Sequence, residues 1–143
     1  MEEREFTDRL LAGGDMLVYL KHRFLTKRTA EQRTWFYGCL RDSLLLVPTL
    51  PVSGAPDRLE DETGKKYLPV FSQERQMPPD YASEFILRTL SFADCLAFAR
   101  SFPDISAIEL DGFSEPFTID YEMADAILRS PSRRREEEPQ NKG

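Results

Sequence analysis

Residues 63–72 constrain the fold of this chain more than any other segment. They read Thr-Gly-Lys-Lys-Tyr-Leu-Pro-Val-Phe-Ser. Thr63-Gly64 supplies the positive-φ position of a tight hairpin, and the aromatic and β-branched residues that follow favour a half-buried strand. Pro69 removes one backbone donor, so this strand is expected at a sheet edge or with a bulge. The segment therefore predicts a hairpin in which residues 58–62 pair with residues 65–71.

Apolar periodicity and capping residues predict further elements on both sides of this hairpin. Strands are expected at residues 44–47, 85–90, 105–110 and 117–119, and helices are expected to start at Asp15, Thr29, Ser91 and Asp120. The first strand is expected to leave regular pairing at Pro48. Strands and helices mix without strict alternation, which indicates an α+β fold. Its sheet is mostly antiparallel or mixed, with helices packed on it and two helices at the N-terminus.

Length and composition are typical of one globular domain. Of the 143 residues, 1–14 are expected to be a flexible segment, 15–129 the domain, and 130–143 a disordered charged tail. A net charge of -6 disfavours binding to nucleic acid. The acidic N-terminus is unlike a secretion signal, and no apolar run approaches the ~18 residues of a spanning helix. We therefore expect a cytoplasmic protein without a membrane segment.

The sequence offers no pattern typical of a catalytic or metal site. His22 is the single histidine, and Cys39 and Cys95 lack the close spacing of metal-binding cysteines. We expect an exposed histidine and two buried, reduced thiols. The chain is accordingly not expected to be an enzyme or to bind a cofactor.

The order of these segments matches a known family. A helical pair ends at residues 39–43, a strand reaches Pro48, and the segment at 64–72 follows. This arrangement resembles the SseB N-terminal domain family of bacterial proteins over residues 15–128. Residues 105–113 take the place of a Gly-Ile-Val-Ile-Asn-Pro-Phe-like segment, with Leu110-Asp111 where that family has Asn-Pro. The resemblance implies a cytoplasmic, bacterial α+β domain and supplies no catalytic residues.

Without a catalytic pattern, the leading hypothesis is a non-enzymatic protein-interaction or regulatory module. Aromatic residues beside an edge strand suit a protein partner. The candidate partner surface comprises Lys65, Tyr67 and Phe71 of the hairpin and Asp111, Phe113 and Glu115 of the turn after residue 110. The sequence does not predict an oligomeric state.

The alternative is a regulator that binds a small molecule or a metal through the acidic turns between Asp104 and Asp120. Five carboxylates could hold a hard cation there, although caps and turns are the more ordinary interpretation of Asp104, Glu109, Asp111, Glu115 and Asp120.

Overall fold

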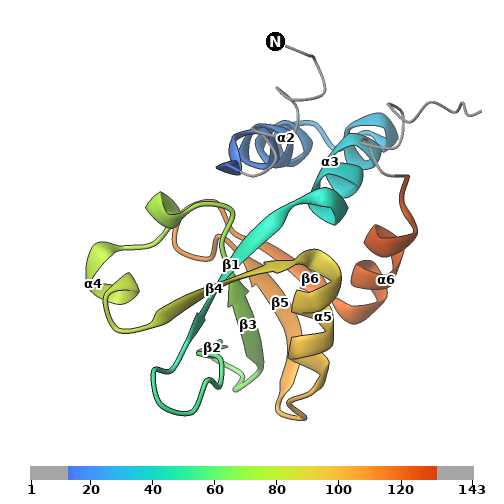
Figure 1. Cartoon of the computed structure of the whole chain (residues 1–143). Helices are drawn as coiled ribbons and strands as arrows, with labels where there is room; N and C mark the ends of the chain where they lie inside the picture. Colours follow the sequence, from blue (N-terminus) through green and yellow to red (C-terminus); the bar gives the residue numbers. More distant parts are fainter. Residues whose placement is uncertain (1–12, 132–143) are drawn as a thin grey trace, which may run out of the picture.

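The computed structural model describes residues 13–131, so the expectations for residues 1–12 and 132–143 lie outside it. The helices are α2 (Asp15–Thr26), α3 (Ala30–Asp42), α4 (Pro79–Ala82), α5 (Phe92–Arg100) and α6 (Tyr121–Arg129), with a 3₁₀ turn η1 (Glu74–Gln76). The strands are β1 (Leu44–Thr49), β2 (Leu59–Glu60), β3 (Lys66–Val70), β4 (Ile86–Ser91), β5 (Ile105–Leu110) and β6 (Phe117–Asp120). Figure 1 shows α2 and α3 above the strands. The predicted α+β class, with two N-terminal helices, is confirmed.

The strands form two sheets, one mixed and one antiparallel, that meet at β3. One sheet has the order β2-β3-β5-β6, in which only β3 and β5 are parallel, and the other is the antiparallel pair β1-β4. Leu46 and Phe71 join the sheets by exchanging two backbone hydrogen bonds of 2.9 Å. The predicted hairpin is thus confirmed as β2-β3. Beyond the end of β2, strand β1 lies along the same edge of β3.

Two prolines lie inside strands because each one faces a gap in the pairing. On one edge of β3, Tyr67 pairs with β2 and Phe71 pairs with β1. Pro69 lies between these two pairings, so neither β2 nor β1 loses a hydrogen bond from the missing N–H of the proline. A register shift between Lys66 and Tyr67 supplies the expected bulge. The prediction that the first strand leaves its pairing at Pro48 is wrong, because β1 continues to Thr49. The nitrogen of Pro48 points away from β4, so no bond of that ladder is lost.

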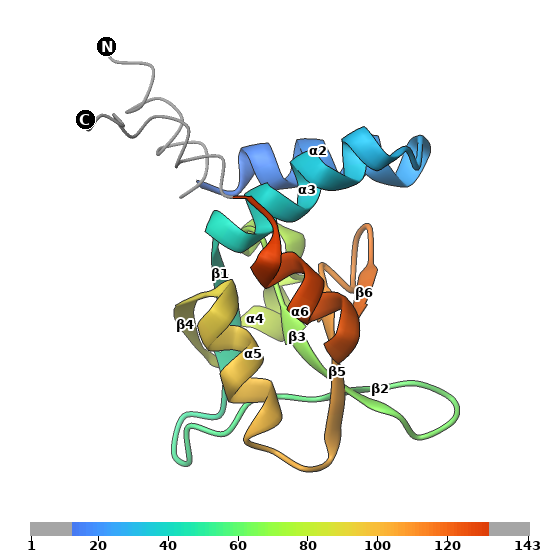
Figure 2. The ribbon, with the colours of Figure 1, turned by 90° about the vertical axis from the view of Figure 1, so that its right-hand side faces the viewer.

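The hydrophobic core lies between the helices and one face of the sheet. Alternate residues of three strands point into it, namely Leu68, Val70, Ile108, Leu110, Phe117 and Ile119. Helices α5 and α6 pack on β5, and Figure 2 shows them on the same side of the sheet. Cys39 and Cys95 are buried in this core, as expected. Among the described residues, no helix has the length and apolarity needed to cross a membrane.

Three of the four predicted helix starts are confirmed. The side chains of Thr29, Ser91 and Asp120 each accept a hydrogen bond from the backbone N–H three residues later. Asp15 does not cap α2, because Gly14 occupies that position with φ 81° and Asp15 is the first helical residue. A Cβ on Gly14 would lie 2.2 Å from the carbonyl oxygen of Ser72, so the start of α2 packs directly on the chain after β3.

Candidate functional site

A buried polar cluster joins α2 to the ends of β3 and β5. We call Lys21, Ser72 and Asp111 the buried junction. Lys21 is 1% exposed and Asp111 is 0% exposed, and the Lys21 ammonium lies 2.9 Å from Oδ2 of Asp111. Ser72 donates to the same carboxylate twice, from its backbone N–H at 2.9 Å and from its hydroxyl at 2.8 Å. The buried carboxylate of Asp111 therefore has a counter-charge, Lys21, and hydrogen-bond donors from Ser72.

Local sequence explains how these groups come together. Lys21 lies on the buried face of α2 with Leu17 and Phe24, and its ammonium also donates to the carbonyl of Glu115. Asp111 follows β5 with φ 54°, a left-handed conformation that aspartate adopts more readily than most residues. Its own N–H donates to the carbonyl of Val70 at 2.9 Å and extends the β3-β5 pairing by one bond.

The buried junction contains a hydroxyl, a carboxylate and an amine, which are groups that also serve in catalysis. Ser72 is only 4% exposed, and its hydroxyl is committed to Asp111. A substrate cannot reach this oxygen in the described structure. The arrangement fixes the turn after β5 in place and supplies no accessible nucleophile.

An aromatic cluster lies on the sheet face opposite the core. We call Phe71, Tyr81, Phe85 and Phe113 the aromatic patch. Phe113 stacks on the buried Phe71 with ring centroids 6.0 Å apart and planes 2° apart, and Tyr81 lies 4.9 Å from both Phe113 and Phe85. The hydroxyl of Tyr81 donates to Asp57 at 2.6 Å, and burial together with this bond raises the pKa of Tyr81. Phe113 nevertheless remains 46% exposed.

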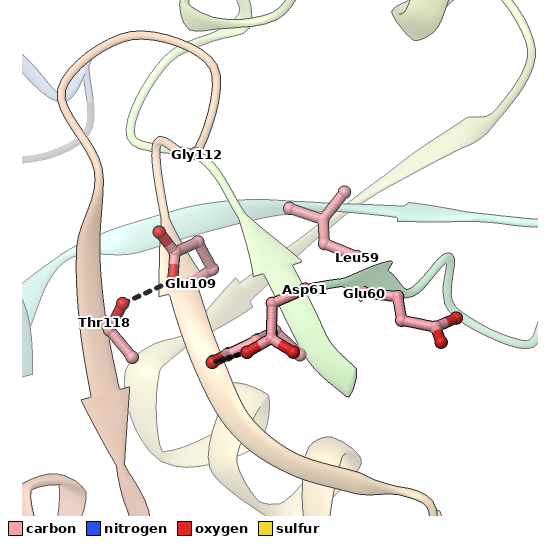
Figure 3. Close-up of a pocket in the computed structure, with 7 residues that line it drawn as sticks. Leu59, Glu60, Asp61, Glu109, Gly112 and Thr118 are labelled. Carbon is pink, nitrogen blue, oxygen red and sulfur yellow. Dashed lines mark hydrogen bonds between the residues drawn. The ribbon is translucent and has the colours of Figure 1, made fainter. Parts of the chain in front are cut away.

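A hollow of about 250 Å³ opens on the same face, beside β2 (Figure 3). We call it the acidic hollow; its lining residues are Leu59, Glu60, Asp61, Tyr67, Glu109, Gly112 and Thr118. Figure 3 shows Glu109 and Thr118 joined across neighbouring strands, where the Thr118 hydroxyl donates at 2.6 Å. Hydrogen bonds from Thr63 and then Tyr67 lower the pKa of Asp61 to about 2. The hollow is therefore negatively charged at neutral pH.

The structure divides the candidate partner surface predicted from the sequence. Lys65 and Tyr67 lie at the β2-β3 hairpin, where the lysine ammonium is 5.4 Å from the tyrosine ring. Phe113 and Glu115 lie at the other end of β3 and β5. Phe71 and Asp111 do not belong to the surface, because both are fully buried, the first under Phe113 and the second against Lys21.

The predicted acidic turns do not converge on one point. Asp104 pairs with Arg58 at 2.7 Å, Glu115 bonds the exposed His22 at 2.8 Å, and Asp120 caps α6. Within residues 13–131, no group of three histidine, cysteine or carboxylate side chains is placed to hold a metal ion.

Sequence reasoning missed the buried lysine and two members of the aromatic patch. Lys21 lies four residues after Leu17 and three before Phe24, so its place on the apolar face of the helix was a usable signal. Tyr81 follows the Pro-Pro step at residues 78–79 without a periodic pattern, and Phe85 is expected only as the first residue of a strand. Only the tertiary structure brings them to Phe113.

Comparison with protein families finds one match. The model described as "SseB protein N-terminal domain" matches residues 22–123, which include β1 to β6 and all six residues of the predicted partner surface. No curated protein and no solved structure matches the chain.

Proposed function

The chain belongs to the SseB N-terminal domain family, and on that premise we propose that it is a non-enzymatic protein-interaction or regulatory module. Its partner is a protein, and the contact centres on the exposed face of the aromatic patch. We further propose that it works in a bacterial cytoplasm, where two buried thiols stay reduced.

The observation that carries this proposal is the exposed ring of Phe113. A phenylalanine that is 46% exposed on a turn usually moves freely, but this one is stacked on Phe71 and touches Tyr81. The turn itself is anchored by Asp111, whose carbonyl also accepts from Ser114 N–H at 3.1 Å. A ring held in place before binding loses little conformational entropy when a partner covers it.

The magnitude of the expected effect follows from the behaviour of aromatic anchors. Truncating such an anchor costs about 2 kcal/mol or more, which is roughly a 30-fold loss of affinity. Phe113→Ala should keep the fold, because Phe71 remains packed against Tyr81 and the core on the other face is untouched.

Affinity purification from the native organism tests the proposal. The tagged wild-type chain is compared with Phe113→Ala, Tyr67→Ala and the control Val52→Ala, which truncates a fully exposed residue of a loop. A stoichiometric protein partner is expected with the wild type and with Val52→Ala, and its loss is expected with Phe113→Ala or with Tyr67→Ala. Equal recovery with all variants would refute the aromatic patch as the site, and recovery of no partner would count against the proposal itself.

The alternative of a small-molecule or metal-binding regulator has one observation in its favour, at the acidic hollow rather than at the acidic turns between Asp104 and Asp120. The acidic hollow is open to solvent and carries the charged Asp61 beside Glu109. A thermal-shift screen of metabolites and divalent cations tests this alternative, since a ligand of the native state raises the melting temperature. No shift across the screen would remove it.

A further inference from the structure

Strand β4 has one paired edge and one open edge. Among the described residues it pairs with β1 alone, in the register that places Val47 opposite Arg88. The N–H and C=O of Leu46 face Phe71, so the neighbouring residues of β1 face β4. By the same alternation Arg88 faces β1, and the backbone groups of Leu87 and Thr89 point to the open edge.

Of the usual protections against a further strand, the open edge of β4 has only one charged side chain, Arg88. Strand β4 reads Ile-Leu-Arg-Thr-Leu-Ser and contains neither proline nor lysine. Ile86 is 56% exposed, and no described strand, helix or loop pairs with the N–H groups of Leu87 and Thr89. Unpaired backbone groups in a regular extended row are a template for an incoming strand.

We propose that the open edge of β4 binds an extended segment of a protein partner as an additional strand. The segment's side chains must match one face of β4, which carries Ile86, Arg88 and Leu90. The Arg88 guanidinium lies 5.3 Å from the ring centre of Phe98, and no carboxylate of residues 13–131 forms an ion pair with it. The complementary segment therefore carries an acidic residue with an apolar residue two positions away on each side.

A second copy of this chain fits the edge less well. Two-fold pairing centred on Leu87, Arg88 or Thr89 brings the two Arg88 side chains to opposite or diagonal positions, where like charges repel. A pair of six-residue strands also offers less than the roughly 1,000 Å² that a stable interface buries. An extended acidic and apolar segment avoids the repulsion between two Arg88 side chains.

The edge continues the surface of the proposed function. Phe85 precedes β4 directly and packs against Tyr81 with ring centroids 4.9 Å apart, and Tyr81 in turn contacts Phe113. A segment that extends past the start of β4 would cover this ring. The inference thus rests on the proposed function, and it names the kind of partner segment that the function requires.

Selection from random 12-residue peptides displayed on phage tests the edge directly. The wild-type protein should enrich peptides with an acidic residue flanked two positions away by apolar residues. Arg88→Glu should select lysine or arginine at the central position and should weaken the wild-type consensus peptide about 2- to 5-fold, the usual range of one cross-strand pair. Enrichment of unrelated sequences by the wild type, or no enrichment, would overturn the proposal.

A proline in the open edge is the sharper variant. Thr89→Pro removes an N–H that points to the open edge, so the β1-β4 ladder keeps its bonds. Binding of the synthetic consensus peptide should fall at least about 10-fold, because a donor is lost and the ring blocks the approaching backbone. Circular dichroism verifies the fold, and Arg88→Glu supplies an independent answer if this variant unfolds. Unchanged binding by a folded Thr89→Pro would refute the edge.

Affinity purification with Phe113→Ala and Thr89→Pro separates this inference from the proposed function. A partner lost with Phe113→Ala and retained with Thr89→Pro would leave the aromatic patch in place and refute the edge. A partner retained with Phe113→Ala and lost with Thr89→Pro would support the edge and refute the aromatic patch. Retention with both variants would refute both sites.

Discussion

Removing either charge of the buried junction should destabilise the domain far more than removing an exposed charge. Lys21→Met keeps the length of the side chain but leaves the carboxylate of Asp111 with only the two donors of Ser72. Asp111→Asn keeps one oxygen acceptor and tolerates the left-handed backbone, but leaves the ammonium with neutral acceptors only, namely the new amide oxygen and the carbonyl of Glu115. Either substitution leaves a buried charge without its counter-charge.

The expected magnitude follows from the burial of both partners. Breaking a fully buried pair by removing one partner costs about 3–5 kcal/mol, most of it the penalty of the charge left behind. The double variant Lys21→Met/Asp111→Asn leaves no such charge. Its loss should therefore be about 3 kcal/mol smaller than the sum of the single losses.

Urea denaturation followed by the fluorescence of Trp35, the single tryptophan, measures these free energies of unfolding. Arg100→Met is the control, because Arg100 is half exposed and pairs with Asp125 at 3.3 Å, a contact worth at most about 1 kcal/mol. If Lys21→Met cost no more than this control, or if the two single losses added without coupling, the reasoning about the junction would be wrong.

Three further predictions concern a glycine, a surface carboxylate and a buried thiol. Gly14→Ala should cost about 2 kcal/mol more than Gly54→Ala in the same denaturation assay, because both glycines have positive φ but only at Gly14 would the added Cβ clash with backbone, that of Ser72; equal losses would contradict the close approach. Carbon-13 NMR titration should give Asp61 a pKa of about 2, rising in Thr63→Ala; a wild-type value near the usual 3.8 would refute the bonding described. Since that pKa is lowered by folding, the stabilisation from Asp61 is complete above the unfolded value and is lost as the pH falls towards 2. Burial raises the pKa of the Cys95 thiol to about 12, so it should resist Ellman's reagent at pH 8 until the protein is unfolded, whereas rapid reaction of the native protein would show an accessible thiol.

The sequence predicts best those elements whose signals are local. The β2-β3 hairpin depends on Thr63-Gly64, and three helices begin at residues whose side chains bond the next turn. The exception is α2, where Gly14 is the N-cap in place of Asp15, because this position packs against Ser72, which is distant in the sequence. Local capping preference was overruled by tertiary packing.

The candidate site is less predictable because its members are distant in sequence. Phe113 is recognisable as an aromatic residue on a turn, but its stacking on Phe71 depends on the β3-β5 pairing. Asp111 looks like an ordinary turn residue until Lys21 is known to lie beside it. The open edge of β4 follows from a pairing with β1 that no local pattern specifies.

The separation of 90 residues between Lys21 and Asp111 has a consequence for how the protein is made. At about 5–20 residues per second, a ribosome needs roughly 5 to 18 seconds to add the carboxylate after it has added the lysine. During that interval α2 can form, but it cannot bury Lys21 against its partner. The domain therefore completes its fold only after synthesis has passed β5, and a nascent chain arrested before that point would hold α2 undocked from the ends of β3 and β5.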